Sequence, residues 1–302
     1  MPILWILLLT LSVWQARAQA PCAGTPLTAE EITAGWRDLA QTAEWTGGIG
    51  KPLPAGAWKF ENGCVSLDDP KKGGSIFSAR EFGDFELVFD WAIATAGNSG
   101  VKYLGARGRR HPDVFKYELN PMATLGVACL AAMLAVLFGL WRRKFQVKWA
   151  LWTALAAAFL LADGVCFAAA RWFMIYQDAK YYPTGLEYQI IDNDRNSDGK
   201  LPTHRTGALY DMLVPSNADP FPPGDFNQSR IVVNGNHAEH WLNGRKVLEY
   251  EFGSEQLKDA VAHSKFAKLP DMARKNVGYL ELQNHGAQIQ FRNFRIRGLP
   301  SH

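Results

Sequence analysis

Two Asn-Gly dipeptides in the last third of the chain place the strongest limit on its fold. Asn234-Gly235 and Asn243-Gly244 separate runs in which apolar and polar side chains alternate. Asn and Gly both accept the positive φ of a tight hairpin turn, and alternation with a period of two is typical of a strand with one face in a core. We therefore predict an antiparallel meander with strands at 229–233, 237–242 and 246–250.

The same alternation recurs along much of the chain. In Phe82–Ile93 the aromatic and aliphatic residues fall at every second position and share one face of a long strand. Eleven Trp and 27 Gly suit a β-sandwich with aromatic side chains and many turns. The expected fold is all-β, with one short helix capped by Thr28 within 27–39. Further strands are predicted at 60–67, 74–78, 97–104, 185–191, 206–211, 278–284 and 287–296.

Length and charge narrow the class of protein. With 302 residues the chain can form one large all-β domain or two smaller ones. A formal net charge of +3 is nearly neutral, and no basic stripe with interleaved aromatic residues is present in the sequence. This argues against a nucleic-acid-binding surface.

The predicted strand Gly185–Asp194 contains the leading candidate functional side chains. Glu187 and Gln189 point to one face, and the apolar side chains between them point to the other. A carboxylate beside a carboxamide presents donors and acceptors that suit the hydroxyls of a sugar. The alternative is an ordinary strand with one solvated face.

Residues 1–18 are predicted to be a secretory signal. An apolar run at 3–13 precedes the small residues Ala16 and Ala18, a pattern that suits cleavage after Ala18. The β domain would then be exported to the periplasmic or extracellular side.

The four cysteines fall into two groups. Cys22 and Cys64 lie in the exported part and are candidates for a disulfide, although spacing alone leaves the pairing open. Cys129 and Cys166 lie in apolar runs and are expected to be packing residues.

Residues 105–180 interrupt the β pattern with two long apolar runs. The runs at about 122–141 and 149–170 are each long enough to cross a bilayer as a helix, and a basic turn separates them. We predict an inserted transmembrane hairpin that anchors the exported β domain to the lipid bilayer. The β domain is thereby divided into parts at 27–104 and 181–300. The alternative is a buried helical pair in a soluble domain.

Five motifs occur together in one order. They are Gly97–Tyr103, Gly185–Asp192, Thr206–Asp211, Asn236–Gly244, and Leu282–Gly286 with Phe291–Asn293. Together they resemble the 3-keto-disaccharide hydrolase domain family, formerly a domain of unknown function, over about residues 35–299 apart from the insert. The resemblance implies a concanavalin-like jelly-roll β-sandwich. It also implies an enzyme that acts on 3-keto-disaccharides or other 3-keto-glycosides.

The implied chemistry needs few groups. A ketone at carbon 3 acidifies the hydrogen on carbon 2, so one base, one group that polarises the ketone and one donor to the leaving oxygen suffice for elimination, and water adds afterwards. The expected catalytic residues are Glu187 as base or metal ligand, Lys102 as polarising cation, and His285 as acid, base or ligand. The expected substrate-binding residues are Gln189, Asn98, Tyr210, His240, Gln283 and Arg292.

Several alternatives stay open. Each of these side chains could instead have a purely structural role: Lys102 as a solvated lysine, Asn98 as a turn-forming residue and His240 as a buried core residue. One alternative is that Glu187 holds a divalent ion such as Ca²⁺ or Mg²⁺, because carboxylates suit hard cations, and no other cofactor is expected. The alternative function is a non-catalytic carbohydrate-binding module on the same jelly roll. A third is that the hairpin, with Asp163 in its second span, is the functional part.

Overall fold

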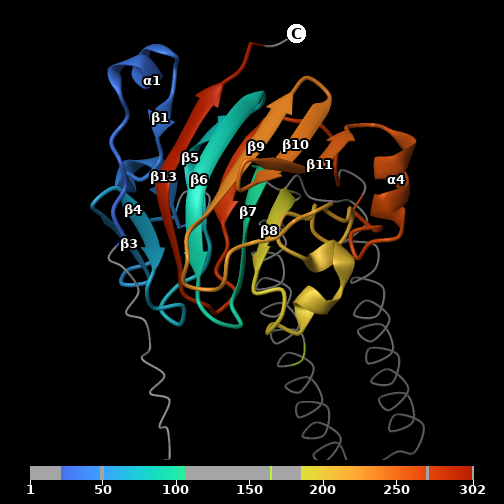
Figure 1. Ribbon diagram of the computed structural model, residues 1–302, viewed down its shortest axis with the longest axis horizontal. Coiled ribbons are helices and arrows are strands. Elements are labelled where there is room, and N and C mark those ends of the chain that lie inside the picture. The colour runs from blue at the N-terminus through green and yellow to red at the C-terminus, as the bar shows by residue number, and fades with distance from the viewer. Residues whose placement is uncertain (1–21, 48–50, 106–163, 165–184, 270–271, 301–302) are drawn as a thin grey trace, which may run out of the picture.

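The computed structural model describes residues 22–47, 51–105, 164, 185–269 and 272–300. Within these residues the chain forms two sheets that pack face to face, and every strand pairing is antiparallel (Figure 1). The predicted all-β sandwich is confirmed.

The larger sheet has eight strands. Its order is β11-β10-β9-β6-β13-β4-β3, and β1 pairs with β13. The strands are β1 (Arg37–Asp38), β3 (Trp58–Glu61), β4 (Cys64–Leu67), β6 (Phe85–Ile93), β9 (Asn227–Asn234), β10 (His237–Leu242), β11 (Arg245–Glu251) and β13 (Ile289–Gly298).

The smaller sheet has five strands and carries the candidate site. Its order is β2-β5-β12-β7-β8, so β8 lies at one edge with β7 and β12 beside it. The strands are β2 (Trp45–Thr46), β5 (Ile76–Phe82), β7 (Asn98–Gly105), β8 (Leu186–Ile191) and β12 (Gly278–Leu282).

Aromatic side chains join the two sheets. Phe85 and Phe89 of β6 are fully buried and meet Tyr103 of β7 and Tyr188 of β8, with ring centroids 6.2 Å and 6.0 Å apart. Burying side chains of this size stabilises a fold by about 1.5–3 kcal/mol each. Because Tyr103 and Tyr188 face this core, their neighbours Lys102 and Glu187 face the other side of the smaller sheet.

The predicted meander is confirmed. Strands β9, β10 and β11 pair in chain order, with one irregularity between His240 and Trp241, and Gly235, Asn243 and Gly244 have φ of 58°, 48° and 78°. These are the left-handed conformations that the Asn-Gly dipeptides favour.

The described helices are short. The helix capped by Thr28 is α1 (Ala29–Thr33), which ends before the predicted limit because Gly35 adopts φ of 83°. A second helix, α4 (Glu255–Ala262), follows β11, and Ser254 caps it through the backbone N–H of Leu257. The short 3₁₀ helices are η1 (Thr42–Glu44), η2 (Asp198–Lys200) and η3 (Pro202–His204).

One predicted strand is wrong. Residues 206–211 form turns that lie along the edge of β8, joined to it by backbone hydrogen bonds and by an isolated bridge between Leu209 and Tyr188, and they form no strand. Positive φ at Gly207 (87°) and Asp211 (61°) prevents an extended conformation.

The transmembrane hairpin must be corrected. Among the described residues there is no helix with the length and apolarity needed to cross a membrane. The described residues thus show a two-sheet β-sandwich and support neither the inserted transmembrane hairpin nor the lipid bilayer as a partner. An apolar run by itself does not establish a membrane span, because hydropathy measures the free-energy cost of exposing a segment to water and does not specify whether lipid or protein covers that segment. The runs at 122–141 and 149–170, including Asp163, lie outside the described residues, as does the predicted signal at 1–18.

The disulfide prediction is confirmed. Cys22 and Cys64 are joined, with their Cα atoms 6.1 Å apart, and the bridge ties the start of the described chain to β4.

Candidate active site

A row of three charged side chains crosses the smaller sheet. Lys102 of β7 lies in register with Glu187 on β8 and with Glu281 on β12. The Lys102 Nζ atom is 4.0 Å from Glu187 Oε2 and 3.7 Å from Glu281 Oε2. Pairing between adjacent strands thus places one cation between two carboxylates.

Glu187 is buried and held by amides. Its side chain accepts a hydrogen bond of 2.8 Å from Gln283 Nε2. When the Gln189 amide is oriented with its nitrogen towards acceptors, it donates to Glu187 Oε1 at 3.1 Å and to the Ser99 carbonyl at 2.9 Å. In the opposite orientation it donates to Asn98 Oδ1 at 3.4 Å.

This environment changes the acidity of Glu187. Burial is the main cause that raises the pKa of its carboxyl to about 7, and the nearby Glu281 raises it further. Lys102, Lys265 and the hydrogen bond from Gln283 act in the opposite direction and lower it. A carboxyl with a pKa near neutrality suits a general base, because it is ionised at neutral pH yet still binds a proton well.

Gly100 makes room for this arrangement. A Cβ atom at this position of β7 would lie 2.7 Å from Gln283 Oε1 and 2.8 Å from Glu187 Oε1. Any larger residue would push the two functional side chains away. The glycine in the Gly97–Tyr103 motif therefore has a steric role beside Glu187.

Two buried acceptors at the site need donors. Glu281 and Gln283 are 6% and 3% exposed, and Glu281 Oε2 and Gln283 Oε1 accept no hydrogen bond from any described residue. A buried acceptor without a donor is costly, so such atoms are typical of positions where a ligand binds. Sugar hydroxyls and hard cations are both suitable partners.

His285 lies at the exposed rim of the site. It follows β12 by three residues and comes two residues after Gln283. Although its side chain reaches solvent, partial desolvation lowers the pKa of its imidazole, as do Lys102 and Lys265, while Asp198 opposes them. His285 therefore gives up a proton readily.

The loop after β8 adds residues that the sequence reasoning missed. His204 lies between Asp198 and Asp211, and the Tyr210 hydroxyl donates to Asp198 Oδ2 at 3.2 Å. Lys265, which follows α4, lies with its Nζ 4.1 Å from the centroid of the Tyr210 ring. Acidic residues around a histidine in the polar segment 192–211 were the available signal.

Two predicted binding residues lie elsewhere. His240 of β10 is buried between the sheets, bonded to the Tyr103 hydroxyl at 2.7 Å and the Gly207 carbonyl at 2.9 Å, and burial lowers its pKa to about 4. Arg292 of β13 is on the larger sheet, where it pairs with Asp90 and covers the Phe226 ring. The other predicted residues, Glu187, Lys102, His285, Gln189, Asn98, Tyr210 and Gln283, lie on or beside β7, β8 and β12.

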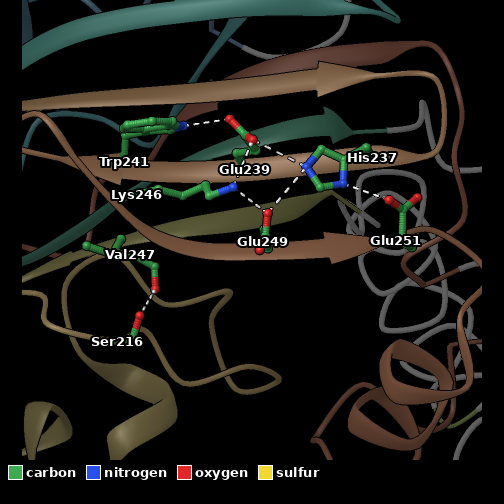
Figure 2. Close-up of polar contacts among 8 residues, drawn as sticks. All are labelled: Ser216, His237, Glu239, Trp241, Lys246, Val247, Glu249 and Glu251. Carbon is green, nitrogen blue, oxygen red and sulfur yellow. Dashed lines mark hydrogen bonds and ion pairs between the residues drawn. The ribbon is translucent and has the colours of Figure 1, made fainter.

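A second polar group has the composition of a metal site. On β10 and β11, ligand atoms of His237, Glu239 and Glu249 lie within 4.8 Å of one another (Figure 2). However, Lys246 Nζ pairs with Glu239 at 3.3 Å and with Glu249 at 2.5 Å, so an ammonium group already supplies the positive charge. We therefore interpret this group as an ion-pair network on the sheet surface.

A cavity of about 330 Å³ opens beyond the end of β8. Residues that line it include Asp192, Arg195, Asp219 and Phe221. Phe221 is 54% exposed. An exposed aromatic residue beside charged groups is suited to bind a polar ring-shaped ligand.

The fold and the site together define a class. Double-sheet jelly rolls include lectin domains, and a sheet face that presents a buried carboxylate, amides and a lysine offers the acceptors and donors that sugar hydroxyls need. The comparisons with known proteins agree with this class and make it specific.

The chain belongs to the family of 3-keto-alpha-glucoside-1,2-lyase-like domains, whose model matches residues 30–126 and 142–297. A 3-keto-disaccharide hydrolase from Bacteroides thetaiotaomicron is 25% identical over 274 residues, which cover 83% of this chain and 73% of that protein. These matches confirm the family resemblance of the sequence motifs.

Solved structures show the same fold. A candidate glycosyl hydrolase from Parabacteroides distasonis aligns with a TM-score of 0.61 at 23% identity, covering 92% of this chain and all of that one. A second from the same organism has a TM-score of 0.50 at 18% identity, covering 87% and 99% of the two chains.

Proposed function

We propose that this chain is an enzyme that cleaves 3-keto-glycosides, including 3-keto-disaccharides, by elimination followed by hydration. The family match and the relative named as a 3-keto-disaccharide hydrolase support this proposal. The observation that carries it is Glu187, a buried carboxyl with a pKa of about 7 beside the Lys102 ammonium. One base next to one cation is what removal of a proton next to a ketone requires.

In the first step Glu187 takes the hydrogen from carbon 2 of the 3-keto sugar as a proton. The electron pair of that bond moves towards the ketone oxygen, which becomes an enolate. Lys102 faces the same space and stabilises the developing negative charge, an interaction that strengthens where water is excluded. Glu281 keeps the lysine in position by pairing with it from the other side.

In the second step the enolate collapses and the bond from carbon 1 to the glycosidic oxygen breaks. A double bond forms between carbons 1 and 2, and the leaving oxygen takes the proton that Glu187 removed, which returns Glu187 to its ionised form. Water then adds across the double bond: the neutral imidazole of His285, whose pKa is lowered, takes a proton from the water as its oxygen bonds to carbon 1, and passes that proton to carbon 2. The free 3-keto sugar results, and both side chains regain their starting protonation. Glu281 Oε2 and Gln283 Oε1 accept hydrogen bonds from sugar hydroxyls.

Isotope labelling tests this route. Elimination and hydration carried out in D₂O place one deuterium on carbon 2 of the product, whereas direct hydrolysis leaves carbon 2 with its original hydrogen. NMR of the product made from a 3-keto-disaccharide distinguishes the two. A product without deuterium on carbon 2 contradicts the elimination route while leaving glycoside cleavage in place.

A divalent cation is not favoured at the same oxygens. Carboxylate and amide oxygens suit Ca²⁺ or Mg²⁺, but the Lys102 ammonium lies 4.0 Å from Glu187 and 3.7 Å from Glu281 and already supplies the positive charge. We therefore expect activity to survive removal of metal. Turnover that is lost on treatment with EDTA and restored by added Ca²⁺ or Mg²⁺ would instead establish the metal.

The competing function is a carbohydrate-binding module. The cavity beside Phe221 favours it, because it could hold a sugar without a catalytic group. A 3-keto-disaccharide that binds to the purified protein without being cleaved supports the module, and release of product supports the enzyme.

We also propose that the chain is exported. The predicted signal and the disulfide between Cys22 and Cys64 support this, because disulfides persist in oxidising compartments. Recovery of the chain with free thiols from the cytoplasm alone would contradict it.

A further inference from the structure

We propose that His204 is a positioning residue for this reaction, which through Asp198 and Asp211 fixes Tyr210 and Lys265 beside Glu187. The inference rests on the proposed function. It concerns four residues, Asp198, His204, Asp211 and Lys265, for which the motifs of the sequence predict no role.

His204 is held from both sides. It is 7% exposed, and its Nδ1 and Nε2 atoms each lie 2.7 Å from a carboxylate oxygen, of Asp198 and Asp211 respectively. An imidazole donates from both nitrogens only when it carries two protons. Burial by itself lowers the pKa of His204, but its hydrogen bonds to Asp211 and Asp198 raise it overall.

Each aspartate uses its second oxygen to hold another residue. Asp198 Oδ2 accepts the hydroxyl of Tyr210 at 3.2 Å, and Asp211 Oδ2 accepts the backbone N–H of Lys265 at 2.7 Å. The His204 ring packs on the Tyr210 ring with centroids 4.4 Å apart, and Lys265 Nζ covers the same ring at 4.1 Å. Cation–π contact of this kind favours one position of the ammonium group.

The assembly is connected to the proposed base. The backbone N–H of Tyr210 donates to the carbonyl of Glu187 at 3.1 Å. The Lys265 ammonium lowers the pKa of both Glu187 and His285. His204 therefore controls, through its two aspartates, where a positive charge stands relative to the base.

The backbone conformation of Asp211 indicates that the surrounding fold holds this residue in place. Asp211 adopts φ of 61°, a left-handed conformation that costs a non-glycine residue about 1 kcal/mol or more. Lys265 is otherwise an exposed, flexible side chain, whose position in solution would be spread over many rotamers. Without the support of Asp211 its charge would spend less time near Glu187.

The test compares His204→Gln with Lys265→Gln in the full chain. Lys265→Gln removes the ammonium group, and His204→Gln releases it from its fixed position. In both variants the pKa of Glu187 therefore rises, and the acid limb of the pH profile of kcat/KM moves to higher pH by about half a unit. The double variant should shift no further than either single one. Lys258→Gln, which removes an exposed cation paired with Glu255 on α4, is the matched control and should leave the limb unchanged.

The charged and titratable groups that act on Glu187 are Lys102, Glu281, Lys265 and Tyr210. Those that face His204 are Asp198, Asp211 and Tyr210. If His204 has a purely structural role, His204→Gln lowers the melting temperature and kcat but leaves the acid limb of the kcat/KM profile at the same pH. That result would overturn the inference, as would a shift in Lys265→Gln that is absent from His204→Gln.

A measurement without turnover separates this inference from the proposed function. Carbon-13 NMR of the labelled carboxyl groups, with Glu187→Gln to assign the signal, gives the pKa of Glu187 directly. If the protein does not cleave 3-keto-glycosides, the proposed function fails. The NMR measurement still tests the positioning role in that case. A higher pKa of Glu187 in His204→Gln supports the role of His204 in positioning Lys265, and an unchanged pKa overturns it.

Discussion

At the scale of single residues, burial decides the chemistry of Glu187. The same carboxyl on an exposed strand would be an ordinary acid, whereas here desolvation brings its pKa to about 7. Sequence alternation correctly placed Glu187 opposite the apolar face of its strand, and could not supply the depth at which it lies.

Replacement of the proposed base gives the first prediction. Glu187→Gln should fold, because glutamine has the same shape and can keep a hydrogen bond with Gln283, and kcat/KM should fall by about 10²- to 10⁴-fold. Turnover of a 3-keto-disaccharide is the measurement, and circular dichroism checks the fold. Undiminished turnover would remove Glu187 from the mechanism.

The raised pKa of Glu187 also predicts a pH dependence of activity. The base acts only when ionised, so kcat/KM should increase as pH rises through about 7 and then level off. A profile measured from pH 5 to 9 tests this. An acid limb near pH 4, the position for an unperturbed carboxyl, would contradict the burial argument.

The same shift predicts how stability depends on pH. The pKa of the folded protein exceeds the ordinary value of 4.5, so the folded state binds this proton more tightly than the unfolded chain does. Stability from this group is full below pH 4.5 and is lost as pH rises through about 7. Glu187→Gln lacks that loss, and should gain up to about 3 kcal/mol relative to the parent between pH 4 and 8. Urea unfolding at several pH values measures it; a constant difference would contradict the linkage.

At the scale of elements, strand pairing brings the site together. Residues 102, 187 and 281 are far apart in sequence, and adjacent strands β7, β8 and β12 place them in one row. Gly100, two residues before Lys102 on β7, leaves the space that this row needs.

Gly100→Ala is therefore expected to disturb the site more than the fold. The added methyl group displaces Glu187 and Gln283, which should cost about 1–3 kcal/mol of stability and reduce kcat/KM by more than about tenfold. Gly74→Ala is the control, because a Cβ there meets no atom within 4 Å. Equal activity in the two alanine variants would show that Gly100 is not needed for the site.

At the scale of the whole molecule, the disulfide fixes the N-terminal segment to the larger sheet. Cys22 and Cys64 are separated by 42 residues, and removing a bridge over such a loop costs roughly 2–4 kcal/mol. Replacing both cysteines by serine should lower the melting temperature and leave kcat/KM unchanged at low temperature, since Cys64 lies on the larger sheet and Glu187 and Lys102 lie on the smaller one. Equal melting temperatures with and without reductant would contradict a stabilising role.

The sequence by itself determined the β architecture and the location of most of the site. Alternation and Asn-Gly turns encode strands locally, so β6 and the meander β9–β11 could be predicted, and the motifs placed Glu187 and Lys102 on strands and Gln283 directly after β12. Only the tertiary structure decided which polar residues meet. It placed His240 in the core and Arg292 on the other sheet, it packed His204 against Tyr210, and it brought Lys265 close enough to lower the pKa of Glu187. The physical reason is that residue pattern fixes which face of a strand a side chain occupies, whereas strand pairing and the path of loops, set by contacts between distant residues, fix its neighbours.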